Sequence, residues 1–273
     1  MKRIYVNLKR FDVPAQLGGV NRLAPVEDWA KTIMEGVAGG LAGYGEDVEA
    51  VFFFPEAHLL GAVKSRPGKV KIGCQGVFRD DVAPGGNFGA FTAGRPAAAA
   101  KALGCQYALI GHCEERRDLL GIVSESGGDP DCVSRILNRE IHSALGQGLS
   151  VLYCVGETAQ EHDNWKAVLG QQLEAGLDGV SGPVTIAYEP VWAIGPGKTP
   201  PGADYIKMVA AHIKEMAGNL PVVYGGGLKT ENAKMLASIE EIDGGLIALT
   251  RFSGEIGFYP DEYCEIVREY MGR

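Results

Sequence analysis

Lys9, His112 and Glu189 each follow a short apolar run of the sequence, and together they could carry out acid–base chemistry. An ammonium group can stabilise a developing negative charge, an imidazole can donate a proton or a hydrogen bond, and a carboxylate can remove a proton. Glu189 lies between apolar segments (Ile186–Tyr188 and Val191–Trp192), where poor solvation makes a carboxylate a stronger base. Each residue alone is more often a solvated or structural side chain. Only their placement at one rim of a sheet favours a catalytic function.

The segments that must position these residues alternate between strand-like and helix-like patterns. Most of the apolar runs are continuous, as expected for parallel strands buried on both faces. The sequence predicts strands at Ile4–Asn7, Val48–Phe54, Val70–Cys74, Tyr107–Gly111, Ser150–Val155, Val184–Tyr188, Pro221–Tyr224 and Gly245–Leu249. It predicts helices at Glu27–Ala42, Arg95–Leu103, Asp131–Gly146, Asn164–Leu177, Ala203–Ala217 and Thr230–Ala237.

This alternation favours an α/β fold in the form of a closed (β/α)8 barrel. No Pro/Ser-rich linker or change in composition divides residues 1–273, so a single barrel domain is predicted. In such a barrel the loops after the strands form the active face, which would bring Lys9, His112 and Glu189 to one rim. An open doubly wound sheet is the alternative. It favours a G-x-G-x-x-G turn after its first strand, and none follows Asn7.

Composition and charge narrow the functional class. The chain has 273 residues and a formal net charge of −8 without a long run of Lys or Arg, so neither nucleic acid nor an anionic membrane is an expected partner. The 39 glycines are typical of tight turns and backbone-lined sites. The six cysteines form no C-x-x-C pair, so neither a disulfide framework nor a metal site is expected. Met1–Arg10 lacks the apolar core of a signal peptide, which favours a cytoplasmic enzyme.

Five segments, in order along the chain, resemble the triosephosphate isomerase family. They are N-L-K at Asn7–Lys9, G-A-F-T at Gly89–Thr92, A-L-I-G-H-C-E-E-R-R at Ala108–Arg117, Y-E-P-V-W-A-I-G-P-G-K-T at Tyr188–Thr199, and Y-G-G-G with T-E-N at Tyr224–Asn232. The resemblance covers essentially the whole chain and implies a TIM barrel. It also implies an aldose–ketose isomerase of glycolysis and gluconeogenesis that needs no cofactor and acts on a small phosphorylated sugar. The loop around Thr92 would join two copies into a homodimer.

The resemblance also implies a role for each matching residue. Glu189 would remove the proton beside the substrate carbonyl and return it to the neighbouring carbon. His112, kept neutral, would donate a hydrogen bond to the enediolate. Lys9, assisted by Asn7, would supply positive charge to the oxyanion and the phosphate, and Glu114 would orient Lys9. Triosephosphate isomerase is itself the standard example of this pairing of a glutamate base with a neutral histidine, so these roles are carried over from it.

The phosphate site departs from the family pattern. Gly195 in the lid and Gly227 after the seventh strand match family positions, but Gly227 replaces the usual serine. Ala248 and Leu249 replace paired glycines whose backbone N–H groups approach the phosphate. Arg251 could supply a charged donor instead, although a surface location for it is equally expected.

Two further departures concern the lid and the lysine partner. Pro200 has no N–H group for the latch that closes the family's lid, although Pro196 and Pro200 could pre-shape the loop. Glu115 follows Glu114, so either could pair with Lys9. Interconversion of dihydroxyacetone phosphate and glyceraldehyde 3-phosphate is the leading expectation. A paralogue for a longer ketose such as a tetrulose phosphate, or a non-catalytic sensor of a phosphorylated metabolite, is the alternative.

Overall fold

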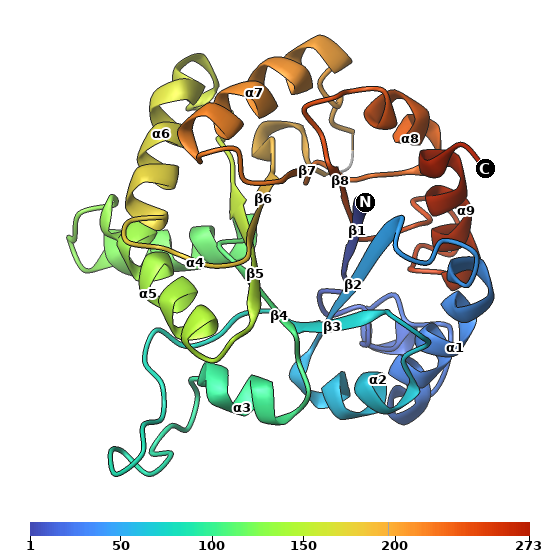
Figure 1. Cartoon of the computed structure of the whole chain (residues 1–273), viewed down its shortest axis with the longest axis horizontal. Coiled ribbons are helices and arrows are strands. Elements are labelled where there is room, and N and C mark those ends of the chain that lie inside the picture. Colours follow the sequence, from blue (N-terminus) through green and yellow to red (C-terminus); the bar gives the residue numbers. More distant parts are fainter. Residues whose placement is uncertain (196) are drawn as a thin grey trace.

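A closed parallel barrel forms the centre of the molecule (Figure 1). The computed structural model describes residues 1–195 and 197–273. Eight strands pair in chain order, and β8 closes the barrel against β1. The strands are β1 (Lys2–Asn7), β2 (Val48–Phe54), β3 (Lys71–Cys74), β4 (Tyr107–Ile110), β5 (Ser150–Val155), β6 (Val184–Tyr188), β7 (Val222–Tyr224) and β8 (Gly244–Ile247). The predicted α/β barrel is confirmed.

Helices surround the barrel. They are α1 (Trp29–Leu41), α2 (Leu59–Ser65), α3 (Ala97–Ala102), α4 (Cys113–Glu125), α5 (Cys132–Gly146), α6 (Trp165–Gly176), α7 (Ala203–Met216), α8 (Thr230–Ala237) and α9 (Pro260–Met271). Six of them match the predicted helices to within a few residues, whereas α2, α4 and α9 were not predicted. The predicted eighth strand was too long at its carboxyl end, because β8 stops at Ile247 and leaves Ala248 and Leu249 in the following loop.

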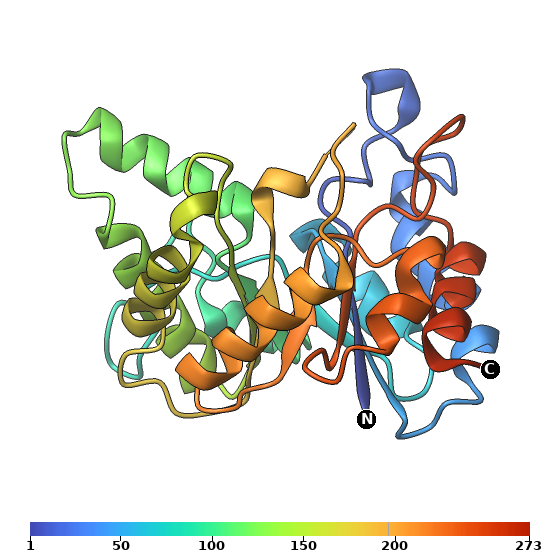
Figure 2. The same ribbon diagram turned by 90° about the horizontal axis from the view of Figure 1, so that it is seen from above.

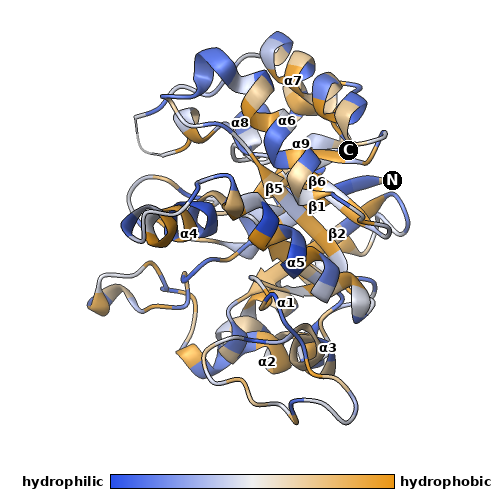
Figure 3. Cartoon of the chain, turned by 90° about the vertical axis from the view of Figure 1, so that its left-hand side faces the viewer, coloured by the Kyte–Doolittle hydropathy of each residue, from blue (hydrophilic) through white to orange (hydrophobic). Residues whose placement is uncertain are grey.

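The continuous apolar runs have partners on both faces of the sheet. In β2, the side chains of Val51 and Phe53 point into the barrel and pack with the interior cluster. Phe52 and Phe54 point the other way and pack against the helices. Because alternate side chains leave a strand on opposite faces, a strand covered on both sides is apolar at every position. Colouring by hydropathy shows apolar strands enclosed by helices that carry hydrophilic residues (Figure 3).

A polar network fills the amino-terminal end of the barrel interior. Glu49 accepts hydrogen bonds from the Tyr5 hydroxyl at 2.9 Å, the Tyr107 hydroxyl at 2.8 Å and the Lys71 ammonium at 2.5 Å. Arg3 lies 3.4 Å from the same carboxylate. Burial acts to raise the pKa of Glu49, but the bonds from Lys71, Tyr107 and Tyr5 outweigh it and lower that pKa. A charged carboxylate is therefore stable inside the barrel.

The loops that follow the strands lie together at the opposite end of the barrel (Figure 2). The connection between β3 and α3 is the longest extension from the barrel and protrudes at the lower left of Figure 1. Its tip carries Phe88, which is 92% exposed, and Thr92, which is also exposed. In the described residues, no helix is both long and apolar enough to cross a membrane.

Candidate active site

Glu189 follows β6, and its carboxylate contacts the ring of His112 and one backbone N–H group. Its side chain is almost fully buried, with 2% of the residue exposed. One carboxylate oxygen, Oε1, lies 3.2 Å from Nε2 of His112, and the other, Oε2, accepts the backbone N–H of Cys113 at 2.9 Å. Gly225, after β7, leaves room for the acid, since a Cβ atom there would lie 2.8 Å from Cγ of Glu189. The predicted base and the predicted proton donor are thus in direct contact.

His112 caps the amino terminus of α4, and this position fixes the roles of its two ring nitrogens. Its Nδ1 accepts the backbone N–H of Glu114 at 3.3 Å. Because Nδ1 acts as an acceptor here, Nε2 is the ring nitrogen that faces Glu189 and is available to donate. His112 can therefore act as a hydrogen-bond donor through Nε2.

Lys9 is fixed in an uncommon backbone conformation beside this pair. Its φ angle is +42°, in the left-handed region that side chains with a Cβ rarely adopt. Its N–H donates to Oδ1 of Asn7 at 3.0 Å, and its carbonyl accepts the side-chain amide of Gln75 at 2.9 Å. Its Nζ donates to Oε1 of Glu114 at 2.7 Å. Strain of this kind persists where the surroundings hold the residue in place.

Glu115 does not pair with Lys9 but stabilises the end of β4. Its carboxylate accepts the N–H of Gly111 at 2.5 Å, while Arg116 donates to the carbonyl of the same glycine at 3.0 Å. The N–H and the carbonyl of Gly111 are therefore both held by consecutive residues of α4, directly before His112. Burial, together with the nearby Glu115 carboxyl, raises the pKa of Glu140 on α5 to about 9. Glu140 is accordingly protonated at neutral pH.

Cys113 places a thiol against the same centre. Its Sγ lies 3.9 Å from both ring nitrogens of His112. Burial, with the negative charge of Glu189, raises the pKa of the Cys113 thiol to about 12, so it is a neutral thiol at physiological pH. His112, Cys113 and Glu189 each offer one ligand atom within 4.8 Å of the others. This grouping was not expected from the sequence, where cysteine spacing alone favoured no metal site.

Glu157, a fully buried residue after β5, anchors the segment that follows Glu189. Its Oε1 accepts the indole N–H of Trp192 at 2.7 Å, the hydroxyl of Tyr188 at 3.0 Å and the hydroxyl of Tyr205 at 3.3 Å. The ring of His162 lies against Trp192 with a centroid separation of 4.5 Å. The start of the predicted lid is thereby tied to β5 and α7. Pro196 lies outside the described residues.

The predicted phosphate-binding residues are on the loops after β6, β7 and β8. Gly227 has φ +94° and its carbonyl accepts the side-chain amide of Asn232 at 3.0 Å. Gly195 is exposed in the lid segment, whereas Ala248 and Leu249 are half-buried directly after β8. Pro200, further along the same lid segment, is also exposed.

Arg251 contacts its own loop. Its Nε and Nη2 lie 2.7 Å and 2.5 Å from Oε1 of Glu262, and its guanidinium carbon stacks 3.9 Å from the centroid of the Tyr259 ring. The backbone of Arg251 pairs with that of Gly257 in a short antiparallel bridge. The guanidinium of Arg251 is therefore partly paired with the first turn of α9, next to this hairpin.

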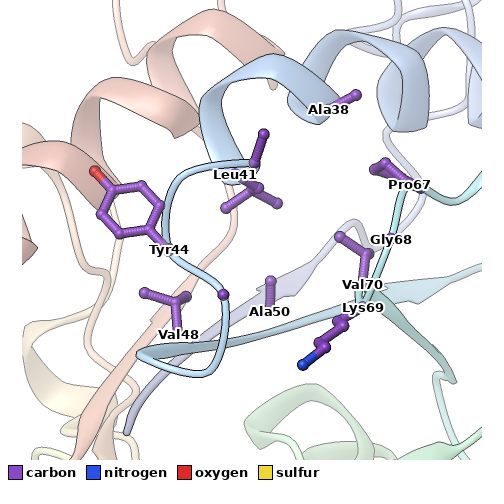
Figure 4. A pocket seen from close by; sticks show the side chains of 11 residues that line it. Ala38, Leu41, Tyr44, Val48, Ala50, Pro67, Gly68, Lys69 and Val70 are labelled. Carbon is purple, nitrogen blue, oxygen red and sulfur yellow. The ribbon is translucent and has the colours of Figure 1, made fainter.

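An open pocket of about 440 Å³ adjoins Lys9 and His112, and the buried Glu189 lies behind its lining rather than in it. Its lining includes Asn7, Lys9, Gln75, His112 and Glu114. A second cavity, of about 320 Å³, lies away from this face, between α1 and the first residues of β2 (Figure 4). Its lining is mainly apolar, and it contains no carboxylate, histidine or cysteine among the described residues. This second cavity therefore lacks the carboxylate and imidazole groups that line the first pocket.

Comparison with known proteins identifies the family. The family model described as triosephosphate isomerase matches residues 26–268. A triosephosphate isomerase of Marinobacter nauticus is 33% identical over 256 residues, which are 89% of this chain and 92% of the relative. One of Alcanivorax borkumensis is 36% identical over 80% of this chain and 86% of its own. The crystal structure of triosephosphate isomerase from Bartonella henselae superposes with a TM-score of 0.72 at 25% identity, covering 99% of both chains. The chain thus belongs to the triosephosphate isomerase family and is an enzyme of the isomerase class, an intramolecular oxidoreductase.

Proposed function

We propose that the protein interconverts dihydroxyacetone phosphate and glyceraldehyde 3-phosphate with Glu189 as the base. The single observation that carries the proposal is the contact between the buried Glu189 carboxylate and Nε2 of His112, at 3.2 Å, beside a fixed Lys9. A buried carboxylate, a neutral donor and a cation are the groups that an enediolate intermediate requires. The chain would act as a single barrel domain over residues 1–273 and needs no cofactor for this reaction.

Substrate would first reorganise the hydrogen bonds of the base. A substrate carbonyl that accepts a hydrogen bond from Nε2 of His112 displaces Glu189 Oε1 from its contact with that nitrogen. Oε1 is then free to take a proton from the adjacent carbon, while Oε2 keeps its bond to the N–H of Cys113. The electron pair of the broken C–H bond forms a carbon–carbon double bond, and the carbonyl oxygen becomes the enediolate oxygen. His112 and the Lys9 ammonium stabilise that oxygen.

Return of the proton completes the isomerisation. Glu189 delivers it to the neighbouring carbon, where the electron pair of the double bond forms the new C–H bond. The hydroxyl proton on the other carbon passes by way of Nε2 of His112 to the former carbonyl oxygen, and the oxygen that loses this proton forms the new carbonyl. No atom is gained or lost overall. The tie between Trp192 and Glu157 would give the lid a fixed base from which to cover the substrate. Exclusion of water matters because an enediolate phosphate exposed to solvent loses its phosphate.

The substrate phosphate would bind over the loops after β7 and β8. Backbone N–H groups of Gly195, Gly227, Ala248 and Leu249 are the proposed donors, with Lys9 contributing charge from the other side. Arg251 would join them by exchanging part of its bidentate pair with Glu262 for a phosphate oxygen.

Replacement of the base tests the proposal. Glu189→Gln should lower kcat by several orders of magnitude and leave substrate binding nearly intact, because an amide cannot accept the proton. Glu140→Gln is a matched control, since Glu140 is also buried and is already neutral at the assay pH. The assay couples dihydroxyacetone phosphate turnover to a dehydrogenase, and calorimetry measures binding. An unimpaired kcat in Glu189→Gln would overturn the mechanism.

The wild-type protein separates the substrate alternatives. Turnover of the triose phosphate at about 1–1,000 per second supports the proposal. Turnover confined to a tetrulose phosphate would assign a longer substrate, and binding without turnover would assign a sensor. The intact set of Asn7, Lys9, His112 and Glu189 favours catalysis, because binding alone requires no base.

We further propose that the enzyme works in the cytoplasm as a homodimer. The protruding loop between β3 and α3 exposes Phe88 and Thr92 at its tip, and a two-fold partner would cover them. Light scattering should report a dimer at micromolar concentration. Thr92→Asp should shift the protein toward monomer, whereas Glu125→Gln, on the exposed end of α4, should not. A fully active monomeric wild type would contradict the dimer.

A further inference from the structure

A nitrogen, a sulfur and an oxygen atom that can each bind a metal lie close together at the proposed base, Glu189. Nε2 of His112 lies 3.2 Å from Oε1 of Glu189 and 3.9 Å from Sγ of Cys113. All three residues offer a ligand atom within 4.8 Å of the others. His112 and Cys113 are adjacent in the chain at the start of α4, and Glu189 reaches them from the end of β6.

These separations are close to those around a tetrahedral zinc ion. Zinc binds histidine nitrogen and carboxylate oxygen at about 2.0–2.2 Å and thiolate sulfur at about 2.3 Å, which places neighbouring ligand atoms about 3.3–3.8 Å apart. Two of the three contacts are already near this range. Rotation of the Cys113 side chain about its Cα–Cβ bond can shorten the remaining separation, from sulfur to the Glu189 carboxylate.

A second carboxylate supports the histidine ligand. Coordination through Nε2 requires a proton on Nδ1, so the ring must turn away from the backbone N–H of Glu114 that Nδ1 accepts in the metal-free structure. Oε2 of Glu114 lies 3.8 Å from Nδ1 and can accept that proton in a hydrogen bond, while Oε1 of Glu114 keeps its contact with Lys9. A carboxylate behind a metal-bound histidine fixes the tautomer and makes the ring a better ligand.

The charge of the ligand set matches a divalent cation. On coordination the Cys113 thiol releases its proton to solvent, and the resulting thiolate and the Glu189 carboxylate together neutralise a double positive charge. Thiolate and imidazole ligands select zinc, cadmium or cobalt over magnesium and calcium. The three ligands leave a fourth position for water.

We propose that His112, Cys113 and Glu189 form a reversible inhibitory site for Zn²⁺ and related thiophilic divalent cations. The bound ion is coordinated by the Glu189 carboxylate oxygen that must accept the substrate proton. It is also coordinated by Nε2 of His112, which must donate a hydrogen bond to the enediolate. Loss of turnover on metal binding rests on the proposed function, whereas the binding site itself rests only on the contacts of these three residues.

Metal binding is tested without reference to activity. Calorimetric titration of the full-length protein with Zn²⁺ should show one equivalent bound with micromolar or tighter affinity. Titration with Co²⁺ should produce a thiolate-to-cobalt charge-transfer band in the near ultraviolet. Cys113→Ser should weaken Zn²⁺ binding at least tenfold and abolish the band. Cys132→Ser, which removes a part-exposed thiol at the start of α5, should leave both measurements unchanged.

Activity is then measured on the same samples. Zn²⁺ should inhibit turnover with the same midpoint as binding, Mg²⁺ should not inhibit, and a chelator should restore activity. Absence of stoichiometric Zn²⁺ binding, or binding and a cobalt band that survive in a folded Cys113→Ser variant, would overturn the proposed site. Stoichiometric binding that is lost in Cys113→Ser but does not affect turnover would support the site and refute instead the catalytic roles given to His112 and Glu189.

Discussion

Gly225 tests whether the position of Glu189, the proposed base, and not only its identity, determines the rate. A methyl group in Gly225→Ala would lie 2.8 Å from Cγ of Glu189 and 2.8 Å from the carbonyl oxygen of Tyr188. Carbon atoms in contact normally stay about 3.5–4.0 Å apart. The Glu189 methylene must therefore move by about 0.7–1.2 Å, which disturbs its carboxylate contacts with Cys113 and His112. A misplacement of about 1 Å at a reacting group costs on the order of 100-fold in rate.

We expect kcat of Gly225→Ala to fall about 10- to 100-fold. Overpacking also costs stability, about 1–3 kcal/mol, so thermal unfolding is followed alongside the coupled assay with dihydroxyacetone phosphate. Gly121→Ala is the matched control: an added Cβ at this exposed position of α4 meets nothing within 4 Å. It should leave kcat unchanged and raise stability by about 0.5–1 kcal/mol. A folded Gly225→Ala variant with kcat within twofold of wild type would refute the reasoning.

Three further predictions concern charge. The folded-state pKa of Glu140 is about 9, above its ordinary value of 4.5. Its contribution to stability is therefore full below pH 4.5 and is lost as the pH rises through 9. Glu140→Gln should flatten the fall in melting temperature between about pH 6 and 9. The pKa of Glu49 is lowered, so Glu49→Gln should cost about 2 kcal/mol at pH 7, and urea titrations should show that difference vanish as pH falls through the folded-state pKa. Arg251→Ala should raise KM about tenfold if its guanidinium binds phosphate. Glu262→Ala, which frees that guanidinium, should leave KM unchanged. Equal increases in KM in the two variants would mean that Arg251 only supports the hairpin.

Most of the barrel could be predicted because its strands are buried on both faces and its larger helices have apolar stripes. The helix α4 could not, since Val123 is its only fully buried residue and the apolar periodicity is weak. The helix α9 has the expected spacing, with Tyr263, Ile266, Val267 and Tyr270 buried, and could have been found.

The site was predictable where the rule of polar residues at strand ends was applied. It was applied to the first, fourth, sixth and seventh strands, and it missed Gln75 after β3 and Glu157 after β5, which the same rule would have found. The contact between Arg251 and Glu262 could not be predicted, because it depends on the geometry of a hairpin. The steric role of Gly225 beside Glu189 also depends on the relative placement of two strands.

The attachment of α4 has a consequence for the order in which the protein loses structure. This helix, green at the upper left of Figure 2, carries His112 at its first turn but buries only Val123. Its connection to the barrel relies on polar contacts from Glu115 and Arg116. Segments with few buried apolar groups open at a lower free energy than the core. Low concentrations of urea should therefore release α4 and inactivate the enzyme before the barrel unfolds, and amide exchange at Gly111 should report that opening.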